Sequence, residues 1–155
     1  MDRIDLRILD ALQTDASLSV AAIAERVGLS QTPCWNRIRR MEEAGVIRQR
    51  VALLDPVALG VPVTVFVSVR TNQHAPEWLE RFAREVTRLP EVTEVYRMSG
   101  DIDYLLKIVC PDIAGYDRVY KRLIAIVDLH DVSSAFAMEE LKATTALPLS
   151  YAGEG

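Results

Sequence analysis

Apolar residues recur every three or four positions in three successive segments near the start of the chain, residues 5–12, 20–27 and 31–44. This spacing predicts three short amphipathic helices. Beyond residue 62 the pattern changes to runs of β-branched and aromatic residues, which alternate with two further helical segments. The hydrophobic pattern therefore divides the chain into a helical first part and a mixed second part.

The junction between the second and third helices is short and well marked. Ser19 is a candidate N-cap for the second helix, and Gly28 can end that helix because glycine readily adopts a positive φ. Ser30 is a candidate N-cap for the third helix, whose first turn contains Pro33. A helix, a tight turn and a second capped helix in this order predict a helix-turn-helix that binds DNA.

The third helix has an apolar and a polar face. The apolar face is formed by Cys34, Ile38 and Met41. Asn36, Arg37 and Arg40 project from the opposite face, where an amide and guanidinium groups suit base edges and phosphates. We expect Arg37 to read a base edge and Arg40 to contact a phosphate. Arginines on such a face are also found solvated or paired with carboxylates such as Glu42 and Glu43.

The segment after the third helix connects the two parts of the chain. Gly45–Ile47 ends the helix, and Arg48–Leu54 is predicted to form a short strand, which would be the wing of a winged helix. Residues 55–62 contain two prolines and a glycine and are the expected linker. The first domain is therefore expected to span residues 1–54.

The second part predicts a β, α, β, β, α, β order. The strands are expected at Val63–Thr71, Val92–Ser99, Tyr104–Cys110 and Val132–Leu141, and the helices at Pro76–Leu89 and Ile113–Val127. This order is typical of a ferredoxin-like fold, so the whole chain is assigned to the α+β class. The second domain is expected to span residues 63–155, with Tyr151–Gly155 as a loose tail.

Charge is distributed unevenly along the 155 residues. The chain has a net charge of −4, yet residues 1–54 carry eight basic and seven acidic side chains, whereas residues 55–155 carry ten and fifteen. Positive charge therefore lies where DNA is expected to bind. Two cysteines without a spaced framework fit a reducing cytoplasm, and neither a secretory signal nor a membrane-spanning apolar run is found.

A glycine and two carboxylates lie between two predicted strands, in the segment Met98–Tyr104. Asp and Gly are common in hairpin turns, so a plain turn is one interpretation. In the other, the N–H groups of Gly100 and Asp101 bind a ligand carboxylate while Asp101 or Asp103 binds an ammonium group. That combination would suit an α-amino acid.

The sequence contains no spacing typical of a metal site and no nucleophile paired with a base, so no cofactor and no catalytic residue are expected. The alternative function is that of an enzyme, which would use Asp101, Asp103, His74, His130 or a cysteine. A ligand-sensing module without DNA binding is a third interpretation, although the third helix is intact. Cys34 is either a redox-sensitive thiol or a small packing residue.

Taken together, these motifs resemble the Lrp/AsnC family of feast/famine transcription regulators over nearly the whole chain. The matching segments are Asp2-Arg3-Ile4-Asp5, Arg26-Val27-Gly28-Leu29-Ser30, Thr32-Pro33-Cys34, Arg37-Ile38-Arg39-Arg40-Met41-Glu42, Gly45-Val46-Ile47, Ser99 to Lys107, and Met138-Glu139-Glu140. The resemblance implies a winged helix-turn-helix, a hinge, and a ferredoxin-like domain that senses amino acids and forms homodimers, which assemble into octamers. It also implies DNA-contacting positions at Ser30, Gln31, Thr32, Trp35, Asn36, Arg37 and Arg40.

The resemblance further implies that an amino-acid effector binds in a cleft between neighbouring dimers. The loop positions are Met98, Ser99, Gly100, Asp101, Asp103 and Tyr104, and the last strand of the adjoining subunit would add Ser134, Phe136 and Met138. The motifs Thr32-Pro33-Cys34-Trp35 and Ser134 to Glu139 look most like the branch that controls cysteine detoxification. Cysteine is therefore the first expected effector, followed by methionine or another small amino acid.

A regulator of this kind would couple ligand binding to assembly. The effector would favour one oligomeric arrangement and so change the spacing of the DNA-binding domains. Because a dimer presents two recognition helices related by a two-fold axis, the double-stranded DNA operator is expected to be an imperfect palindrome.

Overall fold

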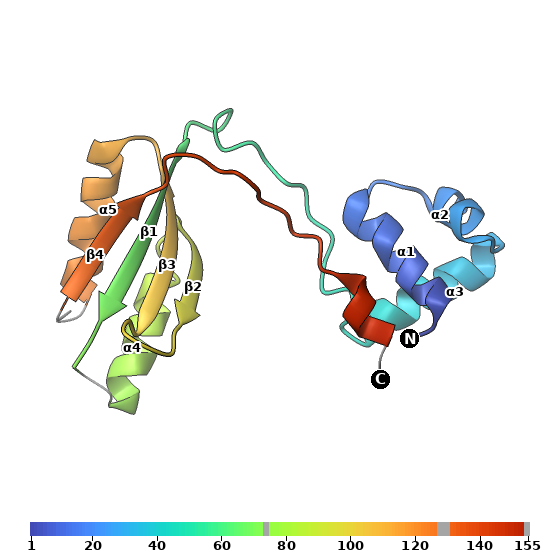
Figure 1. The fold of residues 1–155 in the computed structure, drawn as a ribbon, viewed down its shortest axis with the longest axis horizontal. Coiled ribbons are helices and arrows are strands. Elements are labelled where there is room, and N and C mark those ends of the chain that lie inside the picture. Colours follow the sequence, from blue (N-terminus) through green and yellow to red (C-terminus); the bar gives the residue numbers. More distant parts are fainter. Residues whose placement is uncertain (73–74, 127–130, 154–155) are drawn as a thin grey trace. The chain divides into compact units, whose positions relative to one another are not determined.

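The computed structural model describes residues 1–72, 75–126 and 131–153. The chain forms two compact units, one made of residues 1–53 with 142–155 and the other of residues 54–141 (Figure 1). Each unit has its own hydrophobic core.

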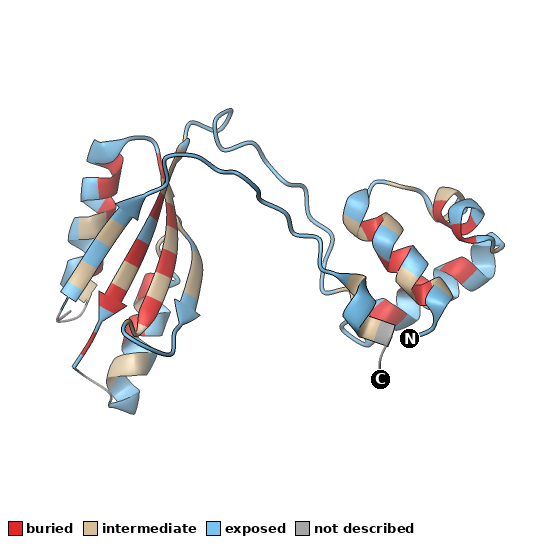
Figure 2. Cartoon of the chain, viewed as in Figure 1, coloured by how far each residue is buried: buried red, intermediate tan, exposed pale blue. Residues whose placement is uncertain are grey.

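Three α-helices form the N-terminal part of the first unit, as the apolar spacing predicts. They are α1 (Arg3–Thr14), α2 (Val20–Val27) and α3 (Gln31–Glu43). Their apolar faces meet in one core, which appears as buried stripes along the inner sides of the helices (Figure 2). The fully or almost fully buried members of this core are Ile8, Ile23, Ala24, Cys34, Ile38 and Met41.

Both ends of α2 follow the predicted capping chemistry. The Ser19 hydroxyl accepts a hydrogen bond from the Ala22 N–H at 3.2 Å, and Gly28 ends α2 with a φ of 76°. Asp2 and Asp5 form a capping box at the start of α1, which was not predicted from the sequence. Interactions between residues that are close in sequence therefore fix the start of α1 and both ends of α2.

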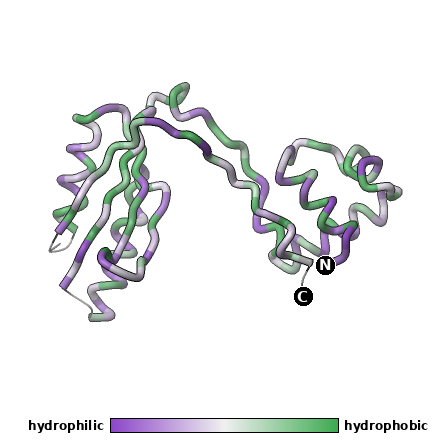
Figure 3. Tube along the Cα trace, in the orientation of Figure 1, coloured by the Kyte–Doolittle hydropathy of each residue, from purple (hydrophilic) through white to green (hydrophobic). Residues whose placement is uncertain are grey.

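The strand expected at Arg48–Leu54 is not formed, and this prediction was wrong. The segment includes apolar residues, which are green in Figure 3. Their side chains are exposed, with Val51 at 60% and Leu53 at 71%. No described strand of the chain pairs with it, and a strand needs a hydrogen-bonded neighbour. Beyond it, Asp55 begins a turn that ends near Gly60, whose φ is 72°.

The C-terminal segment belongs to the first unit and not, as expected, to the second domain. A short 3-10 helix, η1 (Leu149–Gly153), contacts α1, and Leu149 packs against the helical core. Gln13 binds both backbone groups of Leu147, donating to its carbonyl at 3.1 Å and accepting from its N–H at 3.0 Å. The described part of the expected loose tail is thus ordered against α1.

The second unit contains a four-stranded antiparallel sheet. Its elements are β1 (Val63–Arg70), α4 (Pro76–Val86), β2 (Val92–Arg97), β3 (Tyr104–Cys110), α5 (Ile113–Ile126) and β4 (Asp131–Phe136). The strand order β2-β3-β1-β4 is that of the predicted ferredoxin-like fold. The expected fourth strand is shorter than predicted, since residues 137–141 form no strand.

Both helices of this unit pack on one face of the sheet. Alternate residues of β1 and β3 are buried, as a strand with one covered face requires (Figure 2). The core between sheet and helices contains Val65, Val67, Val69, Leu106 and Ile108 from the strands and Phe82, Val86, Val119 and Leu123 from the helices. The opposite face of the sheet has no covering element among the described residues.

Candidate nucleic-acid interface and effector-binding loop

The polar face of α3 is open to solvent at its first two turns. Ser30 occupies the N-cap position, but its hydroxyl makes no capping hydrogen bond. The exposed residues of these turns are Gln31, Thr32, Pro33, Trp35 and Asn36. Five of the predicted DNA-contacting positions, including Ser30, are therefore accessible at the helix end that enters the major groove in helix-turn-helix proteins.

Two arginines of α3 turn toward α1. Arg37 Nη1 lies 2.6 Å from Asp2 Oδ2 and 2.7 Å from Asp5 Oδ1, and Arg40 Nη2 lies 2.8 Å from Asp5 Oδ2. The Asp5 side chain is only 1% exposed, whereas that of Arg40 is 63% exposed. Hydrogen bonds to Asp2 and then Asp5 raise the pKa of Arg37 above its ordinary value. The carboxylate partners of these arginines come from α1 and its cap, not from Glu42 or Glu43.

Arg39, which was not among the predicted DNA-contacting residues, lies on the solvent side of α3. Its guanidinium carbon is 5.4 Å from the centre of the Trp35 ring, and its Nε is 2.7 Å from Glu43 Oε1. Trp35 is 47% exposed, so both groups of this stack are accessible. The i and i+4 positions of Trp35 and Arg39 in the sequence are the signal that would have identified the pair.

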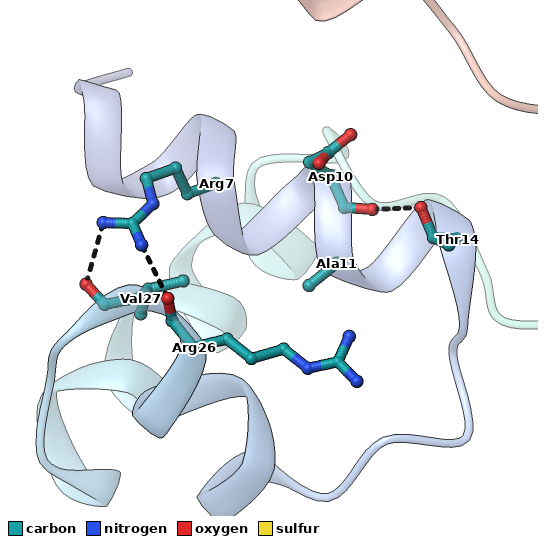
Figure 4. Close-up of a pocket in the computed structure, with 6 residues that line it drawn as sticks. All are labelled: Arg7, Asp10, Ala11, Thr14, Arg26 and Val27. Carbon is teal, nitrogen blue, oxygen red and sulfur yellow. Dashed lines mark hydrogen bonds between the residues drawn. The ribbon is translucent and has the colours of Figure 1, made fainter.

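Arg7 of α1 binds the C-terminal end of α2, next to the turn of the helix-turn-helix. Its guanidinium donates hydrogen bonds to the Arg26 carbonyl at 2.6 Å and the Val27 carbonyl at 3.3 Å, at the C-terminal end of α2 (Figure 4). A positive group there compensates the helix dipole and satisfies free carbonyls. A shallow hollow of about 280 Å³ lies beside it, lined by Arg7, Asp10, Ala11, Thr14, Arg26 and Val27.

The predicted effector loop is anchored by Asp103. The Asp103 N–H donates to the Val69 carbonyl at 2.9 Å, its carbonyl accepts from the Met98 N–H at 2.8 Å, and its carboxylate accepts from the Thr71 N–H at 2.8 Å. Asp103 thus joins the β2–β3 connection to the end of β1. Its partner Thr71 was not identified from the sequence, because it lies 32 positions away.

The tip of the same loop is exposed. Met98 is 39% exposed, and Ser99, Gly100 and Asp101 are also exposed. Gly100 has a φ of 117°, a conformation that favours glycine. Tyr104, by contrast, is buried and its ring lies 4.6 Å from that of Phe82, measured between centroids. Of the predicted loop residues, Asp101 therefore presents an exposed carboxylate while Tyr104 belongs to the core.

The predicted effector residues of the last strand lie at the opposite edge of the sheet. Ser134 forms a short hydrogen bond with the Tyr116 hydroxyl, and the Phe136 ring meets that of Tyr116 edge to face with centroids 5.2 Å apart. Burial, the dominant cause, raises the pKa of Tyr116. Met138 is 95% exposed. Because β1 separates β4 from β3, one chain does not bring these residues together with the β2–β3 loop.

The open face of the sheet is partly apolar. The strand register places Phe66 between Lys107 and Ala135, and Leu105 opposite Tyr96. Phe66 is 39% and Tyr96 51% exposed. Lys107 pairs on this face with Glu94 at 3.2 Å, and the Tyr96 hydroxyl and Lys107 lower the pKa of Glu94.

The described residues contain no group of three or more His, Cys, Asp and Glu side chains arranged to hold a metal ion. No helix in the described parts of the chain is long and apolar enough to cross a membrane. Cys34 and Cys110 are free and buried, and burial raises the pKa of both thiols. His74 and His130 lie outside the described residues.

Both halves of the chain match known protein families. Residues 1–48 match the profile described as winged helix-turn-helix DNA-binding, and residues 64–147 match the Lrp/AsnC ligand binding domain. The chain is 51% identical over 149 residues to the glutamate uptake regulatory protein of Zymomonas mobilis, covering 96% of this chain and 91% of the relative. It is 46% identical over 150 residues to the DNA-binding transcriptional activator DecR of Escherichia coli K12, covering 96% and 99%.

The chain is also similar to solved structures of transcriptional regulators. An AsnC family transcriptional regulator from Agrobacterium tumefaciens is 63% identical, with a TM-score of 0.95 over 97% of this chain and 99% of that one. A transcriptional regulator from Neisseria meningitidis, solved as a complex with L-Met, is 34% identical, with a TM-score of 0.93 over 98% and 99%.

Proposed function

The chain belongs to the Lrp/AsnC family of DNA-binding transcriptional regulators, which are not enzymes, and we propose that it is a cytoplasmic homo-oligomer that couples binding of a small amino acid to operator binding. The supporting observation is the β2–β3 loop. Asp103 fixes the base of this loop through Thr71, while Gly100 and Asp101 remain exposed at its tip. A fixed loop with an exposed carboxylate suits recognition of an ammonium group.

The effector proposed first is cysteine, followed by methionine or another small amino acid. The motif resemblance to the cysteine-detoxification branch favours cysteine. The similarity to a regulator solved as a complex with L-Met supports methionine as the second candidate. Because one relative is named for glutamate uptake, glutamate should be tested beside them. The effector would lie between the exposed loop residues of one subunit and Ser134, Phe136 and Met138 of an adjoining one.

Dimerisation is proposed to use the open face of the sheet. The apolar residues of this face include Phe66, Leu105, Val109, Tyr96 and Ala135. Burying it against a second copy would remove apolar surface from water, which stabilises association. Dimers would then assemble further, as octamers, and the effector would act by favouring one arrangement of the assembly.

The DNA operator is proposed to be an imperfect palindrome. Two recognition helices related by a two-fold axis contact half-sites about one helical turn, roughly 10 base pairs, or a multiple apart. The proposed contacts come from Ser30, Gln31, Thr32, Trp35 and Asn36 at the open end of α3, with Arg40 as a phosphate contact. If the DNA wraps around the assembled dimers, bendable operator sequences would also be favoured.

A thermal-shift screen against the twenty amino acids tests the sensor half of this proposal. A ligand that binds only the folded state raises the midpoint, by an amount equivalent to about 2.7 kcal/mol at one hundred times its dissociation constant. We expect L-cysteine to raise the midpoint more than its oxygen analogue L-serine. Fluorescence anisotropy with a selected operator duplex should then change on addition of the same amino acid. No shift with any amino acid at millimolar concentration would contradict the proposed effector class.

A further inference from the structure

The three arginines of α3 differ sharply in their interactions. Arg37 is only 25% exposed and binds two carboxylates, whereas Arg39 is 60% exposed and binds one exposed glutamate, Glu43. A guanidinium offers five N–H donors in a rigid fork, so its existing partners decide which donors are free for DNA. The partners of Arg37 and Arg39 indicate opposite roles.

Arg37 is committed to α1 by a buried carboxylate. Asp5 is 1% exposed, and its two oxygens accept from Arg37 at 2.7 Å and Arg40 at 2.8 Å. Breaking an ion pair to a buried carboxylate is unfavourable, because the carboxylate then loses part of its charge compensation. Both contacts of Arg37 with the aspartates use Nη1, which holds the guanidinium beside α1, so we expect the interaction with α1 to persist in the DNA complex.

Asp5 is itself held in place by the first turn of α1. Its Oδ2 accepts the Asp2 N–H at 3.1 Å, while Asp2 Oδ1 accepts the Asp5 N–H at 2.8 Å. Arg37 therefore joins the middle of α3 to a capping box that cannot rotate independently of α1. Together with Arg40, one turn further along α3, it fixes how far α3 is rotated about its own axis.

Arg39 is arranged in the opposite way. Its guanidinium lies over the Trp35 ring, 5.4 Å from the centroid, and its Nε pairs with Glu43 at 2.7 Å. An exposed ion pair of this kind is weak and is easily exchanged for a phosphate. The stack on Trp35 limits the orientations of the guanidinium and so reduces the entropy lost on binding.

We infer that Arg39, presented by Trp35, contacts the DNA backbone, and that Arg37 is a positioning residue that sets the angle of α3 through Asp5 and Asp2. This inference rests on the proposed DNA-binding function. It changes the expectation that Arg37 reads a base edge, and it adds a contact on the same helical face as Gln31 and Trp35.

The test uses an operator duplex that the full-length wild-type protein selects from a random library. Affinity is measured by fluorescence anisotropy across a salt series and across all single-base variants of that duplex, well below the thermal midpoint. Arg39→Gln and Arg37→Lys are compared, because Lys retains a cation that can still pair with Asp5. If the wild-type protein selects no duplex, the proposed function fails before either variant is made.

Arg39→Gln should weaken binding to every duplex about tenfold and reduce the salt slope by about 0.9 for each phosphate that is no longer neutralised, with an unchanged thermal midpoint. Arg37→Lys should keep the wild-type salt slope, lower the midpoint and reduce discrimination at several base pairs in parallel.

Three results would overturn the inference while leaving the proposed function intact. The first is a wild-type affinity and salt slope for Arg39→Gln. The second is a loss of discrimination by Arg37→Lys at a single base pair, which would identify Arg37 as a base reader. The third is a lowered midpoint for Arg37→Lys with wild-type discrimination throughout, which would make Arg37 merely structural.

Discussion

The Asp103 carboxylate accepts a hydrogen bond from the Thr71 N–H at 2.8 Å, which joins the β2–β3 loop to the end of β1. The neighbouring carboxylate, Asp101, is exposed. Two aspartates separated by one residue therefore have different roles: one supports the loop, and the other is available to a ligand.

Substitution of these aspartates should separate stability from sensing. Asp103→Ala removes the acceptor of the buried Thr71 N–H and should lower the free energy of unfolding by about 1–3 kcal/mol, whereas Asp103→Asn retains an acceptor oxygen and should recover most of it. Asp101→Asn should change stability by less than about 0.5 kcal/mol but abolish the thermal shift with the effector. Urea unfolding and thermal shift measure the two effects. A destabilised Asp101→Asn would instead indicate a structural turn.

The docking of the C-terminal segment on α1 can be measured because each unit has one tryptophan, Trp35 and Trp78. In a Trp78→Phe background, urea unfolding followed by Trp35 fluorescence reports the first unit. Gln13→Ala should lower its free energy of unfolding by about 1 kcal/mol, because it removes both hydrogen bonds to Leu147. Leu149→Ala should lower it by about 1–2 kcal/mol because it removes apolar packing.

The matched control is Leu147→Ala. The Leu147 side chain is 71% exposed, and its backbone groups would still bind Gln13. Its effect should stay within about 0.5 kcal/mol. Wild-type stability in all three variants would contradict docking of the C-terminal segment.

If the open face of the sheet is the dimer interface, a charged residue introduced there should weaken dimerisation. Phe66→Glu places a carboxylate at the centre of this face and should weaken self-association by at least about tenfold, since burying an unpaired charge costs several kcal/mol. Sedimentation equilibrium measures the effect. Ile113→Glu is the control, because Ile113 is 74% exposed at the start of α5 and lies away from the sheet's open face. Equal weakening by both variants would contradict the proposed interface.

Local features of the sequence predicted most of the fold. Ser19 and Gly28 delimit α2 because caps and positive φ depend on neighbouring residues, and the alternation of β1 depends on its own side chains. Arg48–Leu54 was mispredicted because strand formation needs a partner, which local pattern does not reveal.

The candidate site was harder to predict because its important contacts are distant in sequence. Arg37 was expected to face DNA or Glu42 and Glu43, yet its partners Asp2 and Asp5 lie 35 and 32 positions away. The Asp103–Thr71 contact likewise spans 32 positions. A helical wheel shows which face a side chain occupies but not which element packs against that face, so the roles of these residues needed the three-dimensional structure.

Asp2 makes the first unit sensitive to acid. Its pKa is lowered below the ordinary value of 3.8, first by the Asp5 N–H and then by Arg37. A carboxyl group whose pKa is lower in the folded state contributes stability above its unfolded pKa and loses that contribution as the pH falls through the folded pKa. The unfolding free energy of the first unit should therefore decrease below about pH 4.

Asp2→Asn provides the decisive comparison, because asparagine remains a good N-cap but cannot titrate or form the ion pair with Arg37. We expect this variant to be less stable than wild type at pH 7, with the difference narrowing toward about pH 2.5. Asp15→Asn is the control: the pKa of Asp15 is also lowered, chiefly by Ser17, but its replacement leaves Arg37 unchanged. Trp35 fluorescence in the Trp78→Phe background follows unfolding at each pH. If added salt reduces the effect of Asp2→Asn but not that of Asp15→Asn, the ion pair with Arg37 is its source; a constant difference between Asp2→Asn and wild type from pH 7 to about pH 2.5 would contradict the assignment.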